Sequence, residues 1–356
     1  MNESSAMKDD RFNYSIAFMR IFFVFFVICN HFYWPTEYLD SYRIAVTDRM
    51  KTVAVLIFII ISFYLAEKHF RDAGADWLKK RAWRFIFPLW AWGVLYFIGF
   101  GVIDAAVRTA GYEPGLSLAY TFKDLLWQLS LGSDRYLCPP LWYQFDLVVL
   151  TVTVWIVYRY FNKYLWYIIS LLGLMSIGAQ YFGLNYYLFG KYEYEVCYPL
   201  GRIMEVLPLA IIGLTLRRLD LPERLKKYRF RTIAVCFVAL FISANGGLFT
   251  VPEAGFGYGG TFNIVYAVLL FILLYEIPFE KMPVAVKKIL RFLSGYSFGV
   301  FCLHFGVGYC WNKVIGHGFG LKNNTLAECF CLYFICILVS WLISLIPGKY
   351  ASQLVK

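Results

Sequence analysis

Apolar runs long enough to cross a bilayer recur along this chain, and they constrain its fold more than any other feature. A helix of about 20 residues spans the hydrocarbon core. Hydrophobic residues make up 60% of the 356 residues and charged residues only 16%, which a soluble domain would not show. The sequence therefore predicts an all-α polytopic membrane protein, with residues 1–356 forming a single transmembrane domain behind a short cytoplasmic tail at about 1–12. We place about ten spans at 13–33, 50–66, 84–105, 140–159, 163–182, 197–216, 231–248, 262–278, 296–314 and 326–346.

The positive charges lie mostly in short segments between these runs, where they determine topology. With the N-terminus inside, 23 of the 34 Lys and Arg residues fall on the cytoplasmic side, 9 outside and 2 within spans. This asymmetry predicts an even number of spans with both termini in the cytoplasm. It also accounts for the net charge of +11 without nucleic-acid binding.

The first run carries Arg20 and ends near His31. A charged residue inside a span marks a functional site by default. Eleven helical steps amount to ~1100° and a rise of ~16 Å, so the two side chains share one face and lie near opposite membrane surfaces. A histidine here suits a general base that acts on an alcohol. The alternative is that His31 bonds a backbone carbonyl while Arg20 snorkels to the headgroups.

Further polar residues are expected at about the depth of His31. Arg202 and Glu205 lie three residues apart on one helix face, and Asp146 follows one turn after Trp142. These groups either pack the bundle as ion pairs and helix-end carboxylates or line a polar cavity. A histidine in the middle of a span, such as the one at 304, is more often a satisfied core residue than a catalyst.

The segment before the third run is strongly basic and predicted to be a cytoplasmic loop. Such a loop either sets topology or receives a polyanionic ligand such as a nucleotide. The sequence has no metal-ligand spacing, phosphate-binding glycine loop or hydrolase motif, so we expect no metal site and no ATP-driven motor.

Taken together, these segments resemble the acyltransferase 3 family of membrane acyltransferases. Arg20 and His31 match its Arg-x10-His signature, and FIIISFYL at 58–65 is similar to its F-x3-S-G-[FY]-L stretch. Phe63 stands where the family usually has glycine, which bears on close backbone approach and ligand contact at that point. The segments KRAWRFIFP (80–88), LWY (141–143), RIMEVLPLAIIG (202–213) and YSFGVFCLH (296–304) resemble further family segments in order.

The resemblance implies transfer of an acyl group, usually acetyl, from cytoplasmic acyl-CoA to a hydroxyl of a cell-envelope polysaccharide or glycolipid. It implies a multi-pass protein of a bacterial inner or plasma membrane, with acyl-CoA, a glycan acceptor and membrane lipids as partners and no nucleic acid. His31 would be the general base, and Arg20 would hold CoA or orient its arm. The resemblance places Lys79, Lys80, Arg81, Arg84, Ser62 and Tyr64 at the donor site, and Trp142, Asp146, Arg202, Glu205 and His304 on the acceptor side.

Two other functions stay open at this point. A translocator of a glycan or lipid-linked sugar needs a continuous polar path and no acyl-CoA, and a non-catalytic scaffold would tolerate alanine at Arg20 and His31. If the chain is a transferase, we expect direct transfer, because Cys29 points ~200° away from His31 around the helix. The oligomeric state is open, a homodimer included.

Overall fold

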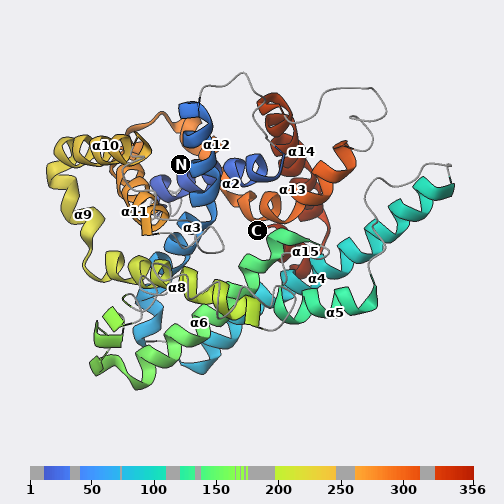
Figure 1. Ribbon diagram of the computed structural model, residues 1–356, viewed down its shortest axis with the longest axis horizontal. Helices are drawn as coiled ribbons and strands as arrows, with labels where there is room; N and C mark the ends of the chain where they lie inside the picture. Colours follow the sequence, from blue (N-terminus) through green and yellow to red (C-terminus); the bar gives the residue numbers. More distant parts are fainter. Residues whose placement is uncertain are drawn as a thin grey trace, which may run out of the picture.

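A computed structural model of the chain describes residues 12–32, 41–72, 74–109, 121–132, 138–164, 166–168, 170–171, 174, 197–245, 261–312 and 325–356. Within these ranges the regular elements are all helical, which confirms the all-α prediction (Figure 1). Five helices among them are long and apolar enough to cross a membrane, or six if one bent pair counts as a span. The predicted run at 163–182 lies mostly outside the described residues. The helices at the predicted runs 197–216, 231–248 and 262–278 are not among these candidate spans. The total of ten spans and the side of each terminus remain predictions.

The five candidate spans fall in α2 (Tyr14–Phe32), α3 (Ser41–Asp72), α4 (Ala75–Thr109), α6 (Trp142–Tyr160) and α14 (Leu326–Leu345). The bent pair is α12 (Val284–Gly295) and α13 (Ser297–Trp311), which meet at 57°. The remaining α-helices are α5 (Phe122–Leu131), α8 (Cys197–Arg218), α9 (Leu221–Leu225), α10 (Arg229–Asn245), α11 (Thr261–Glu276) and α15 (Lys349–Val355).

The basic segment before the third run is helical, so the prediction of a loop there was wrong. Helix α4 begins at Ala75, nine residues before the predicted start of the span, and runs without interruption to Thr109. Lysine and arginine are good helix formers. Their polarity ends the apolar run, but it does not end the helix. The cations are therefore held on a rigid element.

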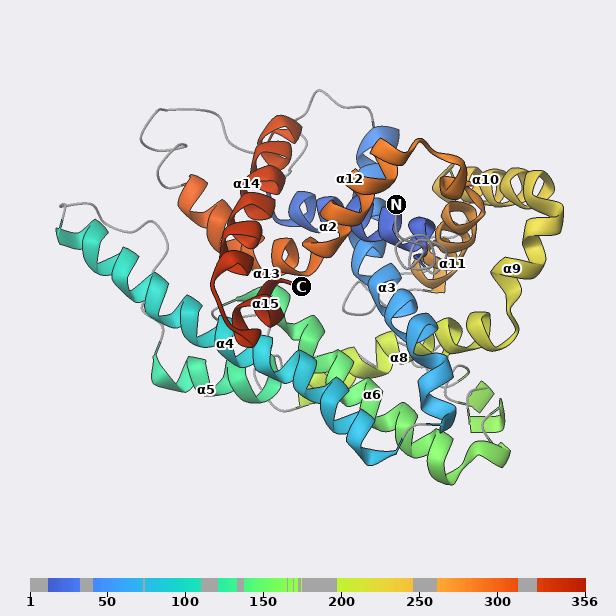
Figure 2. The same cartoon turned by 180° about the vertical axis from the view of Figure 1, so that it is seen from behind.

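Helix α3 is the centre of the bundle, and its segment Met50–Phe70 is the most buried of the five spans. It packs most extensively against α8 and α2, and also against α11 and α6 (Figures 1 and 2). The close contact with α8 depends on Gly213, because a Cβ there would lie 2.5 Å from the carbonyl oxygen of Ile60. Phe63, which stands where the resemblance leads us to expect glycine, is fully buried and stacks on Phe70.

Helices α13, α14 and α15 form a second close contact at Gly299. A Cβ at this position would meet the side chain of Ser340 on α14 and would lie 2.9 Å from Cβ of Val355 on α15. The Trp92 indole on α4 donates a 3.1 Å hydrogen bond to the carbonyl of Leu354. These contacts fix α15 between α4 and α13, close to the middle of the molecule (Figure 2).

Candidate functional site

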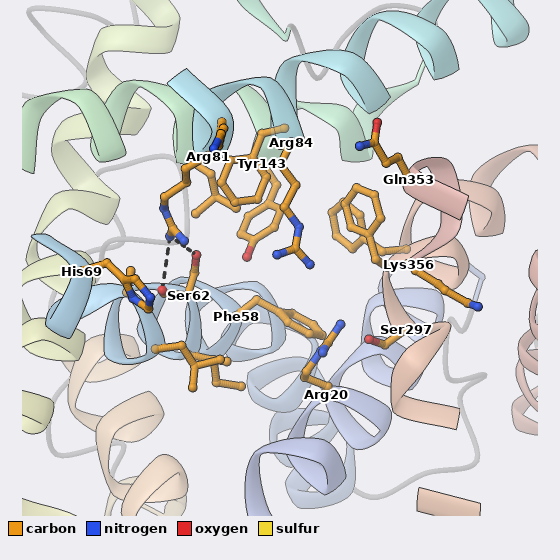
Figure 3. Close-up of a pocket in the computed structure, with 18 of the residues that line it drawn as sticks. Arg20, Phe58, Ser62, His69, Arg81, Arg84, Tyr143, Ser297, Gln353 and Lys356 are labelled. Atoms are coloured by element: carbon orange, nitrogen blue, oxygen red, sulfur yellow. Dashed lines mark hydrogen bonds between the residues drawn. The ribbon is translucent and has the colours of Figure 1, made fainter. Parts of the chain in front are cut away.

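A cavity of about 480 Å³ opens between α2, α3, α4, α6, α13 and the C-terminal end of α15 (Figure 3). No aspartate or glutamate is among the described residues that line it. Clustered charge of one sign in a cleft attracts ligands of the opposite sign. The described lining of the cavity therefore carries positive charge without a compensating carboxylate. Its cations are Arg20, Lys80, Arg81, Arg84 and Lys356.

Arg81 is fixed in the cavity wall. Its guanidinium donates hydrogen bonds of 2.9 Å to the Ser62 hydroxyl and 3.2 Å to the Ser62 carbonyl, and its Nε lies 3.4 Å from the Thr151 hydroxyl (Figure 3). Four aromatic rings surround the guanidinium carbon at 5.4–6.0 Å, and cation–π contacts of this kind stabilise a partly desolvated arginine. These rings belong to Phe63, Phe70, Trp77 and Phe85.

The other cations have no acidic partner in the part of the chain that the structure describes. Arg20 reaches the cavity from α2 and Arg84 from α4, and their guanidinium groups point toward one another across it (Figure 3). Like charges that converge without a counter-ion repel each other. A bound anion would relieve that repulsion, which is the arrangement expected of a phosphate site.

Two residues predicted for the donor site do not line this cavity. Lys79 is exposed on α4. The Tyr64 hydroxyl lies 3.1 Å from the Tyr275 hydroxyl, to which it donates, and accepts a 3.2 Å bond from Arg217. Residues two apart on a helix differ by ~200°, so Ser62 and Tyr64 face opposite ways. Packing decides that Ser62 faces the cavity and that Tyr64 faces away from it.

Tyr64 belongs to a polar network on the other side of α3. The Tyr275 hydroxyl donates a 2.7 Å bond to Glu223, and Lys226 lies 2.8 Å from the same carboxylate. Burial would raise the pKa of Glu223, but the hydrogen bonds from Lys226 and Tyr275 outweigh it, so the pKa lies below its ordinary value. The network ties α9 to α3 and α11.

The structure adds residues that sequence reasoning missed. Ser297 on α13, Gln353 on α15 and Lys356 just beyond α15 line the cavity (Figure 3). The Gln353 side-chain oxygen is buried there without a hydrogen-bond partner among the described residues. The sequence analysis included Lys356 only in the count of cytoplasmic positive charges. No local sequence pattern indicated that it lies near Arg20.

His31 and His304 are brought together from α2 and α13. Their ring centroids lie 5.2 Å apart, and their planes make an angle of 41°. Neither ring lines the cavity. Phe301 does, and its ring centroid is 6.0 Å from that of His304. One aromatic side chain therefore stands between the basic cavity and the histidine pair.

The remaining predicted acceptor-side residues form a buried cluster between α6 and α8. The Arg202 guanidinium donates to both carboxylate oxygens of Asp146 at 2.8 and 2.9 Å, and its carbon lies 4.8 Å from the Trp142 ring centroid. Asp146 and Glu205 are fully buried, and Arg202 is 1% exposed. Arg202 thus reaches across to the neighbouring helix, in addition to sharing a helix face with Glu205. None of the four residues lines the cavity.

Comparison with known proteins places these features in a family. Residues 13–345 match the model of the acyltransferase 3 family, described as an acyltransferase domain. This chain belongs to the acyltransferase 3 family. The comparisons found no matching curated protein and no matching solved structure. The matched region runs from the start of α2 to the end of α14, so Gln353 and Lys356 are cavity residues beyond the family domain.

Proposed function

We propose that this membrane acyltransferase is an O-acyltransferase that moves an acyl group, acetyl in the first instance, from cytoplasmic acyl-CoA to a hydroxyl of an envelope polysaccharide or glycolipid. The observation that carries the proposal is the cavity with five cations and no described carboxylate. Among acyl donors, CoA thioesters are the ones that bring several phosphates. In a member of an acyltransferase family, such a cavity is the natural donor site.

The donor binds with its phosphates among the cations. Arg20 and Arg84 clamp phosphate oxygens, since a guanidinium matches phosphate geometry, and Lys80 and Lys356 add point charges at the rim. Arg81 is already hydrogen-bonded to Ser62, so its guanidinium contributes a positive electrostatic potential from a fixed position.

Part of the cavity wall between the cations is aromatic. Tyr143 and Phe301 pack with ring centroids 5.2 Å apart, and Phe58 lies 6.5 Å from Phe301. The thin, uncharged pantetheine arm lies along this wall. Phe301 also packs against His304, with ring centroids 6.0 Å apart, so this ring lies between the donor site and the histidine pair.

The chemistry is direct transfer. One His31 nitrogen takes the proton of the acceptor hydroxyl while the hydroxyl oxygen attacks the thioester carbonyl carbon. The carbon–sulfur bond breaks, and the proton passes to the departing thiolate, giving an ester and free CoA. Cys29 is fully buried, which supports a route without an acyl-cysteine. The buried Arg202–Asp146 pair and Trp142 hold the α6–α8 wall in place on the acceptor side.

The deciding experiment measures transfer of labelled acetyl from acetyl-CoA to envelope glycan, in membranes with wild-type protein or His31→Ala at matched expression. We expect loss of the base to lower transfer by ~10²–10⁴-fold. Lys79→Ala, an exposed residue outside the cavity, is the control and should match wild type.

The other outcomes separate the alternatives. Equal transfer by wild type and His31→Ala would remove His31 from the mechanism. Absence of transfer by both, with glycan reaching the surface only when the protein is present, would identify a translocator.

A further inference from the structure

The His304 ring is oriented by the backbone of its own helix. Its Nδ1 lies 2.7 Å from the carbonyl oxygen of Phe301 and 3.3 Å from that of Val300. A carbonyl oxygen only accepts, so Nδ1 carries the proton and donates it. In the neutral ring this leaves the lone pair on Nε2.

That lone pair is buried without a partner among the described residues. His304 is 0% exposed, and its Nε2 makes no hydrogen bond within the described residues. Buried polar atoms are nearly always paired, and an exception calls for an explanation. Here the unpaired atom is an acceptor whose ring is held in one orientation.

His31 is the polar group beside it. The two ring centroids lie 5.2 Å apart, and the other described rings around the pair belong to phenylalanines at 32, 301 and 305. Among the described residues no carboxylate contacts either histidine, so none of them takes the place of the orienting aspartate common beside a catalytic histidine. The χ2 angle of a histidine is soft, so the His31 ring is free to turn one of its nitrogens toward His304.

We propose that His304 is the positioning residue for His31. Its Nε2 accepts a hydrogen bond from one N–H of His31, which fixes the tautomer and leaves the lone pair on the other His31 nitrogen directed at the acceptor hydroxyl. This inference rests on the proposed function and gives His304 a role other than substrate binding.

The difference in solvent exposure between the two histidines assigns their roles. His31 is partly exposed and can meet an acceptor, whereas His304 is fully buried. The reacting proton therefore moves from the hydroxyl to His31 and then to the thiolate. His304 keeps its own proton on Nδ1 throughout and stabilises the His31 imidazolium by accepting its N–H.

Two polar variants of similar size test this role. In His304→Asn the amide nitrogen lies near the position of Nδ1, so the bond to Phe301 is kept while the acceptor at Nε2 is lost. In His304→Gln the side-chain oxygen reaches the position of Nε2 and still accepts from His31. Both keep a polar group in the pocket, and thermal stability of the purified proteins shows whether each variant is folded.

The measurement is kcat and KM for acetyl-CoA in wild type and both variants. We expect His304→Asn to lose roughly 10²-fold in kcat, at the lower end of the effect of a general base, with KM for acetyl-CoA within twofold of wild type. His304→Gln should retain at least a tenth of wild-type kcat. If Gln performs no better than Asn, or if Asn retains wild-type kcat, the positioning role is wrong while the transferase stands. If the wild type transfers no acetyl, both proposals fail.

Discussion

At the scale of single residues, adjacent side chains of the same type differ in whether they line the cavity. Lys79 and Lys80 are adjacent lysines on α4, and both are exposed, yet only Lys80 lines the cavity. Successive residues on a helix differ by ~100°, so one can face a ligand while the next faces away from it. The pair thus provides a matched comparison with the same side chain in the same helix turn.

We predict that Lys80→Ala raises KM for acetyl-CoA roughly fivefold with kcat unchanged, since a solvent-accessible charge contact contributes about 1 kcal/mol. Lys79→Ala should leave KM as in wild type. Steady-state kinetics on the two variants checks this, and a larger effect at Lys79 would contradict the assignment of the donor site. Raising the ionic strength should reduce the difference in KM for acetyl-CoA between Lys80→Ala and wild type, because salt screens exposed charges.

At the scale of elements, the approach of α8 to α3 is decided by one glycine. A Cβ at Gly213 would lie 2.5 Å from the Ile60 carbonyl oxygen and 3.1 Å from the Tyr64 nitrogen. These neighbours are backbone atoms of a buried helix and cannot move aside. The same stretch of α3 carries Ser62, so a displacement of α8 is transmitted to the cavity wall.

We predict that Gly213→Ala destabilises the folded protein by about 1–3 kcal/mol, the usual cost of overpacking a core. Gly101→Ala on α4 is the control, because a Cβ there has no heavy atom within 4 Å. It should not lower stability, since alanine is the better helix former. Thermal unfolding of detergent-purified protein, followed by size-exclusion chromatography, measures both. A Gly213→Ala protein as stable as Gly101→Ala would show that α8 and α3 can separate freely.

At the scale of the whole molecule, the five cations of the cavity gather toward the N-terminal end of α2. Arg20 lines the cavity together with three α4 cations and Lys356, whereas His31, eleven residues further along α2, lies outside it. All of these cations other than Arg20 come from segments that the charge distribution assigns to the cytoplasm. With the predicted topology, the cation cluster lies toward the cytoplasm and His31 toward the opposite surface, which fits acyl transfer across the membrane.

We predict that a reporter joined by a flexible linker after Lys356 lies in the cytoplasm. A fluorescent protein fused there should fluoresce, and alkaline phosphatase fused there should be inactive. This readout does not depend on acyl transfer, so it tests the topology alone. An active phosphatase fusion would place the cavity on the opposite side and contradict cytoplasmic acyl-CoA as the donor.

Sequence by itself determined the class of the protein and the main positions of its charge. Apolar runs and basic segments are local patterns, and the bilayer imposes strict length and polarity rules on them. For the same reason, the shared helix of Arg20 and His31 follows from counting residues alone. The family resemblance read from those segments was confirmed over residues 13–345.

Only the tertiary structure decided which distant residues meet. It paired Arg202 with Asp146, set His304 beside His31, turned Ser62 and not Tyr64 toward the cavity, and added Lys356 to the cation cluster. These contacts join helices far apart in the chain. They depend on how closely the helices approach at crossings such as Gly213 and Gly299, where the shape of the partner helix, and not the local sequence pattern, determines which side chains face one another.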